Sequence, residues 1–223
     1  MKNRQLHFSI VELLIIIAII CVIAALLVSM FADSNSRARL TACANHQRNI
    51  AQCITFYSCD NSGEIPNIMP GLENNSIPIL RLPDYSPVAL GRLIGSYTHE
   101  PGIFGCPDSP GYDQHCVVKN YRTIPMVWSG YLYRARACDF NGQLRAQDNI
   151  NRAIVMDFAC ITPQGEQFAP HRYQRSNILY SDGHVEGRRN SREPFRFYTA
   201  QAARHGELMP DCTLLWQRAD AVD

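Results

Sequence analysis

Residues 8–32 read FSIVELLIIIAIICVIAALLVSMFA, and this stretch decides how the rest of the chain is organised. No residue from Leu13 to Ala32 is charged. With a rise of about 1.5 Å per residue, a helix of this length spans about 30 Å, the thickness of a bilayer's hydrocarbon core. An extended strand would leave its backbone groups unpaired in lipid, so the sequence predicts a membrane-spanning helix. Glu12 stands at the start of this apolar span, and ionisable groups in such positions are usually functional.

Two ordinary explanations exist for an apolar N-terminal stretch. One is a cleaved secretory signal peptide whose basic region would contain Lys2 and Arg4. The apolar run is far longer than such a peptide needs, and no Ala-x-Ala-like site follows it cleanly. The other is a plain signal anchor, in which Glu12 lies at the membrane interface and extends its carboxylate towards water.

A third explanation comes from resemblance. The segment FSIVELL, followed by an Ile-, Ala- and Leu-rich run, resembles the N-terminal motif of type IV prepilins and type II secretion pseudopilins. The resemblance implies that residues 1–7 are a leader peptide, which a prepilin peptidase removes between His7 and Phe8. The chain carries His7 where that family usually has glycine. The resemblance also implies that Glu12 pairs during assembly with the new N-terminal amine of Phe8 on a neighbouring subunit.

The helix is expected to continue beyond the membrane segment. Residues 33–57 contain neither proline nor glycine. Apolar residues recur there at the spacing of one helical face, at Leu40, Cys43, Ala44, Ile50, Ile54 and Tyr57. The segment 59–63, CDNSG, then supplies turn residues that end the helix. We therefore predict one helix of roughly 50 residues, with a transmembrane half (8–32) and an amphipathic half (33–58).

Charge and cysteine content narrow the class of protein. The 223 residues carry a net charge of +1, which does not indicate nucleic-acid binding. Eight of the nine cysteines follow the membrane segment: Cys43, Cys53, Cys59, Cys106, Cys116, Cys138, Cys160 and Cys212. No C-x-x-C spacing suggests a zinc ribbon or a thioredoxin-like motif. We predict at least two disulfides in an oxidising compartment, the alternative being that several cysteines are buried free thiols.

Residues 59–223 are predicted to form one β-rich globular domain outside the cytoplasm. Proline and glycine in residues 64–111 indicate loops with short extended pieces, and Phe104 to Asp108 resembles a strand end entering a turn. The predicted strands are Val117–Tyr121, Ile124–Trp128, Tyr131–Arg134, Ala153–Met156, Asn177–Tyr180 and His184–Glu186, with a turn at Ser129-Gly130, a helix at Pro194–His205 and a last apolar patch at 214–216. The predicted fold class is α+β and pilin-like: a long N-terminal helix packed on an antiparallel sheet with long loops.

A second resemblance lies in the C-terminal half. It is to a module that accompanies prepilin-type N-termini in planctomycete- and Lentisphaera-type bacteria, in which a histidine precedes Asp-Gly by a fixed interval. The matching residues are His171, Asn177, Asp182, Gly183 and His184. The chain has one residue more between His171 and Asp182 than that module. The middle of the chain resembles the family only through Cys106-Pro107 and Asp157.

The Asp-Gly pair predicts a hairpin with a type I′ turn, in which both central residues have positive φ. His171, Asp182 and His184 are acceptable metal ligands, and some related pseudopilins bind calcium. Calcium, however, prefers oxygen ligands to two histidines. We therefore expect no cofactor and no metal, with calcium as the alternative, and we expect His171 to hydrogen-bond to the backbone near the turn.

Nothing in the sequence indicates an enzyme. It contains no G-x-S-x-G, H-E-x-x-H, G-x-G-x-x-G or phosphate-binding loop. A Cys–His pair such as Cys160 with His184 carries no local signature of a nucleophile. Trp128, Tyr131 and Tyr133 could form a sugar-binding platform, although such residues are more often half-buried in strands.

The sequence thus predicts a structural subunit, pilin- or pseudopilin-like, of a membrane-anchored filament or secretion pseudopilus. Expected partners are other pilin-like subunits, a prepilin peptidase, the inner-membrane assembly machinery and membrane lipid, without nucleic acid. The protein would span the bacterial inner membrane once, with its N-terminus cytoplasmic and its globular domain periplasmic or extracellular. The alternative is a membrane-tethered module that binds a glycan or a protein and does not polymerise.

Overall fold

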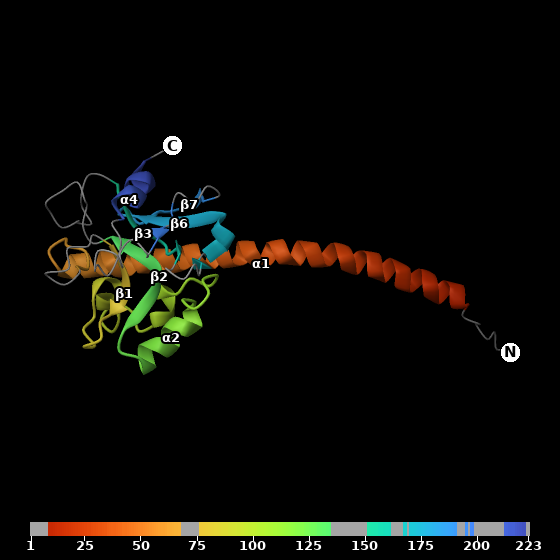
Figure 1. Cartoon of the computed structure of the whole chain (residues 1–223), viewed down its shortest axis with the longest axis horizontal. Coiled ribbons are helices and arrows are strands. Elements are labelled where there is room, and N and C mark those ends of the chain that lie inside the picture. Colours follow the sequence, from red (N-terminus) through yellow and green to blue (C-terminus); the bar gives the residue numbers. More distant parts are fainter. Residues whose placement is uncertain are drawn as a thin grey trace, which may run out of the picture. The chain divides into compact units, whose positions relative to one another are not determined.

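The computed structural model describes residues 9–67, 76–134, 151–161, 167–168, 170–190, 195, 197–198 and 212–221. The fold is α+β, with an apolar N-terminal helix and a five-stranded antiparallel sheet (Figure 1). The chain divides into two compact units, residues 1–38 and 39–223, and the boundary falls inside the first helix.

Helix α1 runs without interruption from Ile10 to Asp60, a length of 51 residues. The prediction of one long helix is therefore confirmed. The helix ends where Ser62 and Gly63 adopt left-handed φ angles of 57° and 85°. The Gly63 N–H donates to the carbonyl of Ser58 at 2.8 Å, so the last helical carbonyls gain a partner.

The second half of α1 buries one face in the globular unit. Cys43, Ile50 and Ile54 lie on this face, as the apolar spacing predicts. Gln47 lies on the same face and is also fully buried, which the apolar pattern did not indicate. Its side-chain amide donates to Asp157 Oδ1 and to the carbonyl of Asn177, both at 3.1 Å, and these bonds make burial of the amide tolerable.

The main sheet has the strand order β1-β2-β3-β6-β7, and all neighbouring strands are antiparallel. Its strands are β1 (Ser76–Arg81), β2 (Val127–Arg134), β3 (Ala153–Asp157), β6 (Arg175–Tyr180) and β7 (Val185–Arg189). A smaller sheet pairs β4 (Cys160–Ile161) with β5 (Gln167–Phe168) and β8 (Phe197–Tyr198). The predicted strand at 153–156 and the hairpin around Asp182-Gly183 are confirmed.

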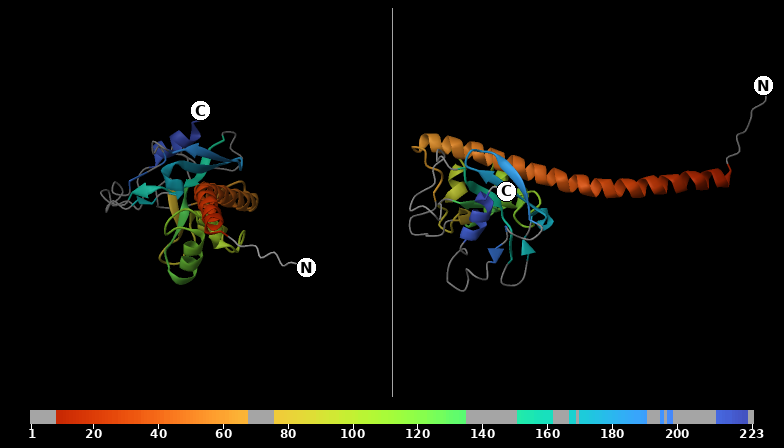
Figure 2. Two further views of the ribbon diagram at one scale, coloured as in Figure 1. Left: turned by 90° about the vertical axis from the view of Figure 1, so that its right-hand side faces the viewer. Right: turned by 90° about the horizontal axis from the view of Figure 1, so that it is seen from above.

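The central strands are covered on both faces, because successive side chains enter two different core clusters. Tyr131 and Tyr133 of β2 pack in the cluster that contains the buried face of α1. Leu132 between them packs with Trp216 of helix α4 (Thr213–Asp220). The packed half of α1 thus covers one face of the sheet and α4 the other (Figure 2). The expected half-burial of Tyr131 and Tyr133 is wrong, since both are fully buried.

The predicted turn at Ser129-Gly130 is wrong, because both residues lie inside the continuous strand β2. Gly130 serves close packing instead. A Cβ atom there would lie 2.4 Å from the backbone nitrogen of Cys106, so only glycine permits this approach. The neighbouring Ser129 hydroxyl donates to the carbonyl of Phe104 at 2.8 Å, which joins the same two segments.

The predicted strand at Val117–Tyr121 is also wrong, since these residues belong to helix α2 (Gln114–Thr123). The side chain of Asp113 caps this helix by accepting hydrogen bonds from the backbone nitrogens of His115 and Cys116. This N-cap overrides the β propensity of the two valines at 117 and 118. The predicted strand end at Phe104 is wrong, because Phe104 is the last residue of the 3₁₀ helix η2 (Pro101–Phe104). The turn predicted after it is present.

The C-terminal part was predicted only in outline. The apolar patch at 214–216 lies in α4, where Trp216 is fully buried. The predicted helix at 194–205 is contradicted at Phe197 and Tyr198, which form β8; apart from Phe195, its other residues lie outside the described part of the chain. Two further 3₁₀ helices are η1 (Ala89–Leu93) and η3 (Pro170–Tyr173).

Candidate functional site

The start of α1 carries the ionisable residue that the sequence singles out. Glu12 Oε2 accepts a hydrogen bond from the Ser9 backbone nitrogen at 2.9 Å, and Ser9 Oγ accepts one from the Val11 nitrogen at 3.3 Å. The bond from the Ser9 nitrogen to Glu12 is the one that a capping box makes, while the Ser9 hydroxyl caps the second helical nitrogen instead of the third. The spacing Ser9-x-x-Glu12 in the sequence is the signal for this cap. Phe8 and His7 lie outside the described residues.

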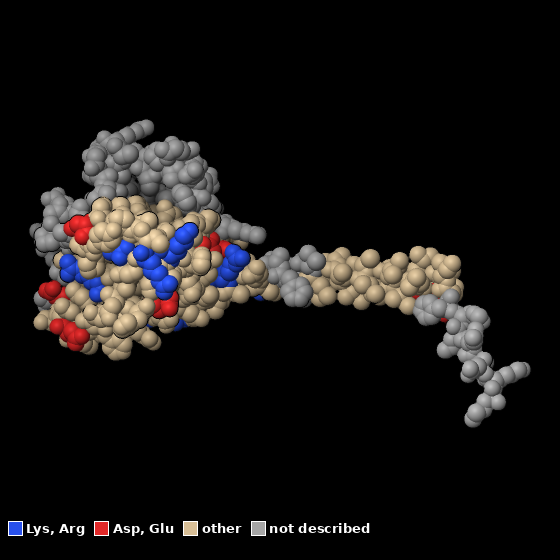
Figure 3. Space-filling view, turned by 90° about the horizontal axis from the view of Figure 1, so that it is seen from below, with Lys and Arg blue, Asp and Glu red and all other residues tan. Residues whose placement is uncertain are grey.

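The first half of α1 presents an apolar surface in every direction. All side chains from Ile10 to Leu27 are exposed, and none is buried by the rest of the chain. Among the described residues, this is the one helix long and apolar enough to cross a membrane. Figure 3 shows the stretch as a nearly uncharged surface. These residues therefore form a candidate membrane anchor.

The C-terminal hairpin differs from the predicted type I′ turn. Residues 181–184 join β6 to β7, and the Tyr180 nitrogen donates to the carbonyl of His184 at 3.0 Å, so that three residues lie between this pair. The Gly183 nitrogen donates to the carbonyl of Tyr180 at 2.9 Å. Gly183 has a φ of 90°, but Asp182 is not among the residues with positive φ. The loop therefore has three residues, with a left-handed glycine closing it, and the type I′ prediction is wrong.

His171 does not join Asp182 and His184. The latter two pair with each other at the exposed hairpin, where His184 Nδ1 lies 2.6 Å from Asp182 Oδ1. His184 also stacks on the ring of Tyr180 with centroids 4.3 Å apart. His171 lies before β6, at the opposite end of the strand from this turn, so neither the expected backbone bond near the turn nor the three-residue ligand set is formed.

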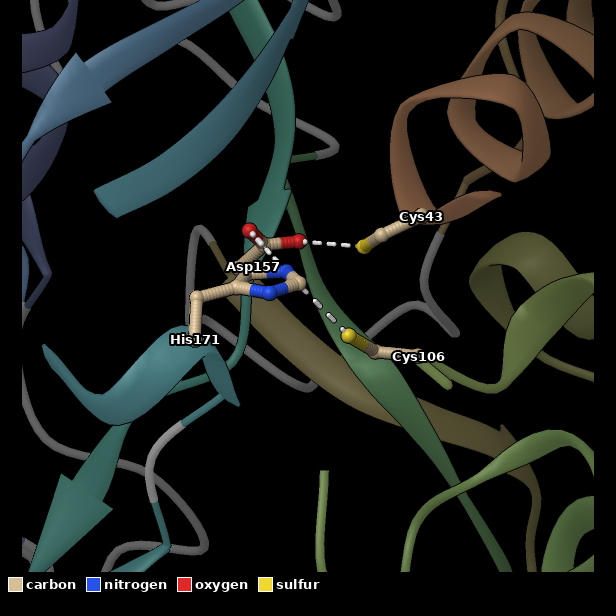
Figure 4. Close-up of side chains that lie close together, drawn as sticks. All are labelled: Cys43, Cys106, Asp157 and His171. Atoms are coloured by element: carbon tan, nitrogen blue, oxygen red, sulfur yellow. Dashed lines mark hydrogen bonds and ion pairs between the residues drawn. The ribbon is translucent and has the colours of Figure 1, made fainter. Parts of the chain in front are cut away.

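His171 lies instead in a buried cluster with Cys43, Cys106 and Asp157 (Figure 4). Cys43 comes from α1, Cys106 from the loop after η2, Asp157 from the end of β3, and His171 from η3. One ligand atom from each residue lies within 4.8 Å of all the others. Cys106 and Asp157, which are far apart in the sequence, thus meet His171 in space.

The contacts within the cluster are short. Cys43 Sγ donates to Asp157 Oδ1 at 3.0 Å. His171 Nε2 lies 3.3 Å from Asp157 Oδ2 and 3.6 Å from Cys106 Sγ. All four side chains therefore direct polar atoms at a common point in the core (Figure 4).

A second group of polar atoms holds the cluster in place. The backbone nitrogen of Asn177 donates to Asp157 Oδ2 at 2.6 Å, and Gln47 donates to the other carboxylate oxygen. The hydroxyl of Tyr131 lies 3.3 Å from Cys43 Sγ. The Asn177 side chain donates to the carbonyl of Leu40 at 3.2 Å, which ties β6 to α1 beside the cluster.

Burial controls the protonation of the cluster. It raises the pKa of the Cys43 thiol well above its ordinary value and also raises the pKa of Cys106. Burial alone would lower the pKa of His171, but hydrogen bonds to Asp157 and Cys43 outweigh it and raise that pKa to about 10. The raised pKa values favour the protonated forms of both thiols and of the imidazole.

These properties do not suit nucleophilic catalysis. A reactive cysteine needs a lowered pKa and access to substrate. Cys106 has a raised pKa and a side chain with no exposed surface. In addition, Cys106 and Asp157 both approach the same imidazole nitrogen of His171, whereas a nucleophile and its orienting carboxylate need opposite nitrogens.

The disulfide prediction is contradicted. Five of the eight cysteines beyond the membrane segment are free thiols: Cys43, Cys53, Cys59, Cys106 and Cys116. The remaining three can form at most one disulfide within the chain, so at least two cannot exist in this structure. The alternative, several buried free thiols, holds for Cys43, Cys53 and Cys106.

Comparison of the chain with protein-family models, with curated proteins and with solved structures finds no match.

Proposed function

We propose that this chain is a pilin- or pseudopilin-like structural subunit that is anchored in a membrane and assembles through α1. One observation carries the proposal: a single helix has a first part that is apolar and exposed and a last part that belongs to the core of a globular unit. The fully apolar part needs either lipid or other helices around it, because the described residues of its own chain do not bury it.

Glu12 is the residue that would distinguish assembly from simple anchoring. Within the apolar stretch it is the one acidic group, and among the described residues its hydrogen-bond partner is the backbone nitrogen of Ser9. In a packed bundle of such helices, a carboxylate that pairs with a neighbour's N-terminal amine sets one register, because an unpaired buried charge costs several kcal/mol. The proposed amine is that of Phe8, freed when a prepilin peptidase cuts after His7.

The proposal extends to location and partners. Residues 1–7 would face the cytoplasm, α1 would cross the inner membrane, and the globular unit would lie outside, with the inner-membrane assembly machinery extracting the subunits. N-terminal sequencing of protein recovered from membranes tests this arrangement. A mature protein that begins at Phe8 supports it, and an intact Met1 contradicts processing.

Substitution of Glu12 tests the assembly mechanism. Glu12→Gln can keep the capping-box hydrogen bond while losing the charge, so it separates the two roles of this side chain. We expect Glu12→Gln and Glu12→Ala to stay in the membrane at normal abundance but to be absent from crosslinked multimers. Glu12→Asp, which keeps the charge, should retain some multimers.

Two results would contradict the mechanism. If Glu12→Gln assembles like the wild type while Glu12→Ala does not, Glu12 acts only as a helix cap. If all three variants equal the wild type and no multimers form, the chain is a tethered binding module. Of the sugar-binding platform suggested for such a module, Tyr131 and Tyr133 are inaccessible, because both are buried in β2.

A further inference from the structure

We propose that Cys43, Cys106, Asp157 and His171 bind a single transition-metal ion, Zn²⁺ or an ion of similar ligand preference, in a closed structural site. Two thiolates, one imidazole and one carboxylate are ligands that Zn²⁺ accepts, and four protein ligands are typical of its structural sites. The two sulfur atoms exclude Ca²⁺ and Mg²⁺ as matching ions, because those ions take oxygen ligands.

The spacing of the ligand atoms fits one tetrahedral ion. Zinc–ligand bonds of about 2.0–2.3 Å place the ligand atoms of a tetrahedron about 3.3–3.8 Å apart. Cys43 Sγ lies 3.0 Å from Asp157 Oδ1, while His171 Nε2 lies 3.3 Å from the other carboxylate oxygen, Oδ2, and 3.6 Å from Cys106 Sγ. With one ligand atom taken from each residue, all four atoms lie within 4.8 Å of one another. Small side-chain shifts therefore suffice to form the site, without movement of the strands.

The surroundings of His171 are those of a metal-bound histidine. Such a histidine donates its second ring nitrogen to a carboxylate or carbonyl, which fixes the orientation of the ring. His171 Nδ1 lies 3.5 Å from Asp108 Oδ2 and has no hydrogen bond of its own, while the backbone nitrogen of His171 donates to the same oxygen at 2.9 Å. Nε2, the opposite nitrogen, is the one directed into the cluster.

The backbone at His171 is also unusual. Its φ is 56°, in the left-handed region that non-glycine residues occupy at a cost. Such conformations persist where the surrounding structure requires a particular side-chain direction. Here the left-handed turn in η3 places the imidazole in the cluster with Asp157 and Cys106.

A metal ion binds cysteine as the thiolate and histidine as the neutral imidazole, so its binding releases protons. The ion with two thiolates and one carboxylate would carry a net charge of −1. The N–H donors of Asn177 and Gln47 lie against that negative charge. The ion would join α1 to β3, η3 and the loop after η2, so its role is to clamp the helix to the globular unit.

The test uses the full chain, extracted from membranes in detergent without chelator. Elemental analysis should find one zinc ion per chain. Protein produced with Co²⁺ in place of Zn²⁺ should show the visible absorption of a tetrahedral site and the near-ultraviolet absorption of thiolate-to-cobalt charge transfer. Folded wild-type protein that lacks the metal and the cobalt spectrum would overturn the proposal, as would a Cys43–Cys106 disulfide detected by non-reducing mass spectrometry.

Variants assign the ligands. Cys43→Ser and Cys106→Ser should lose the metal, whereas Cys53→Ser should keep it, because Cys53 is buried on the same helix but lies outside the cluster. Full metal content in either ligand variant would overturn the site. If a ligand variant does not fold, the cobalt spectrum of the wild type still decides between thiolate ligation and its absence.

Asp108→Asn tests the orienting contact rather than a ligand. Loss of an outer carboxylate partner weakens metal binding about 10- to 100-fold. Chelator competition should therefore show a higher dissociation constant for Co²⁺ with an unchanged absorption spectrum. An altered spectrum would mean that Asp108 is itself a ligand and that the assigned set of four is wrong.

Discussion

The two halves of helix α1 share one secondary structure and differ in what covers them. Residues 10–27 expose all their side chains, whereas residues 43–54 bury one face in the globular unit. Each half also contains a polar residue that stands out: Glu12 accepts a hydrogen bond from the Ser9 nitrogen, and Gln47 is fully buried with two partners in β3 and β6. Among the described residues, none buries a side chain of residues 10–27, whereas the other half of the helix is part of the core of the globular unit.

The comparison teaches that hydrophobicity alone does not say what a helix packs against. A stripe on one face indicates a core within the same chain, and apolar residues on every face indicate lipid or other helices. Substitutions in residues 10–27 should therefore change membrane retention, and substitutions in residues 43–54 should change the free energy of unfolding of the globular unit.

The largest effect is expected from a charge in the middle of the exposed half. Ile19→Arg replaces a residue that favours membrane insertion with one that opposes it. The free energy of insertion becomes less favourable by about 3–4 kcal/mol. The equilibrium constant for membrane insertion, measured through the membrane-bound fraction, should fall about 100-fold or more. Phe56→Arg, on an exposed position of the packed half, is the control and should leave the fraction unchanged.

The next effect concerns the buried amide. Gln47→Ala removes one hydrogen bond to the Asp157 carboxylate and one to a carbonyl, and should lower the free energy of unfolding by about 2–4 kcal/mol. Gln52→Ala, at an exposed position on the same helix, should change it by less than about 0.5 kcal/mol. Denaturant titration measures both, and equal effects would contradict the burial of Gln47.

Gly183→Val separates the stability of the globular unit from anchoring. A β-branched residue at a φ of 90° is strained, so the free energy of unfolding should fall by about 1–3 kcal/mol. Membrane retention should stay at the wild-type level, since retention depends on residues 10–27. Loss of retention together with stability would show that the two units are not independent.

The smallest effect comes from removing a single methylene group. Ile50→Val leaves a small cavity beside β-strand residues and should cost about 0.5–1.5 kcal/mol in the free energy of unfolding. Ile16→Val makes the same change on the exposed half and should leave unfolding unaffected. A shift in the melting temperature for Ile16→Val would mean that this half is covered by the globular unit.

The sequence predicted those helices, strands and turns whose formation depends mainly on residues close to one another in the chain. The helix from 10 to 60, the strand at 153–157 and the hairpin at 182–183 follow from apolar spacing, β-branched residues and turn residues. Local signals failed where a contact distant in sequence decided the structure. Gly130 looks like a turn residue until the backbone of Cys106 is placed against it, and no turn then forms.

The sequence by itself determined the long helix, its apolar and amphipathic halves and the place where it ends, because these depend on the order of neighbouring side chains. Only the tertiary structure decided that His171 leaves Asp182 and joins Cys43, Cys106 and Asp157. Cys43 and Asp157 are 114 positions apart, and no local pattern relates them. They meet because α1 packs across the end of β3, and the bond between Gln47 and Asp157 fixes that crossing.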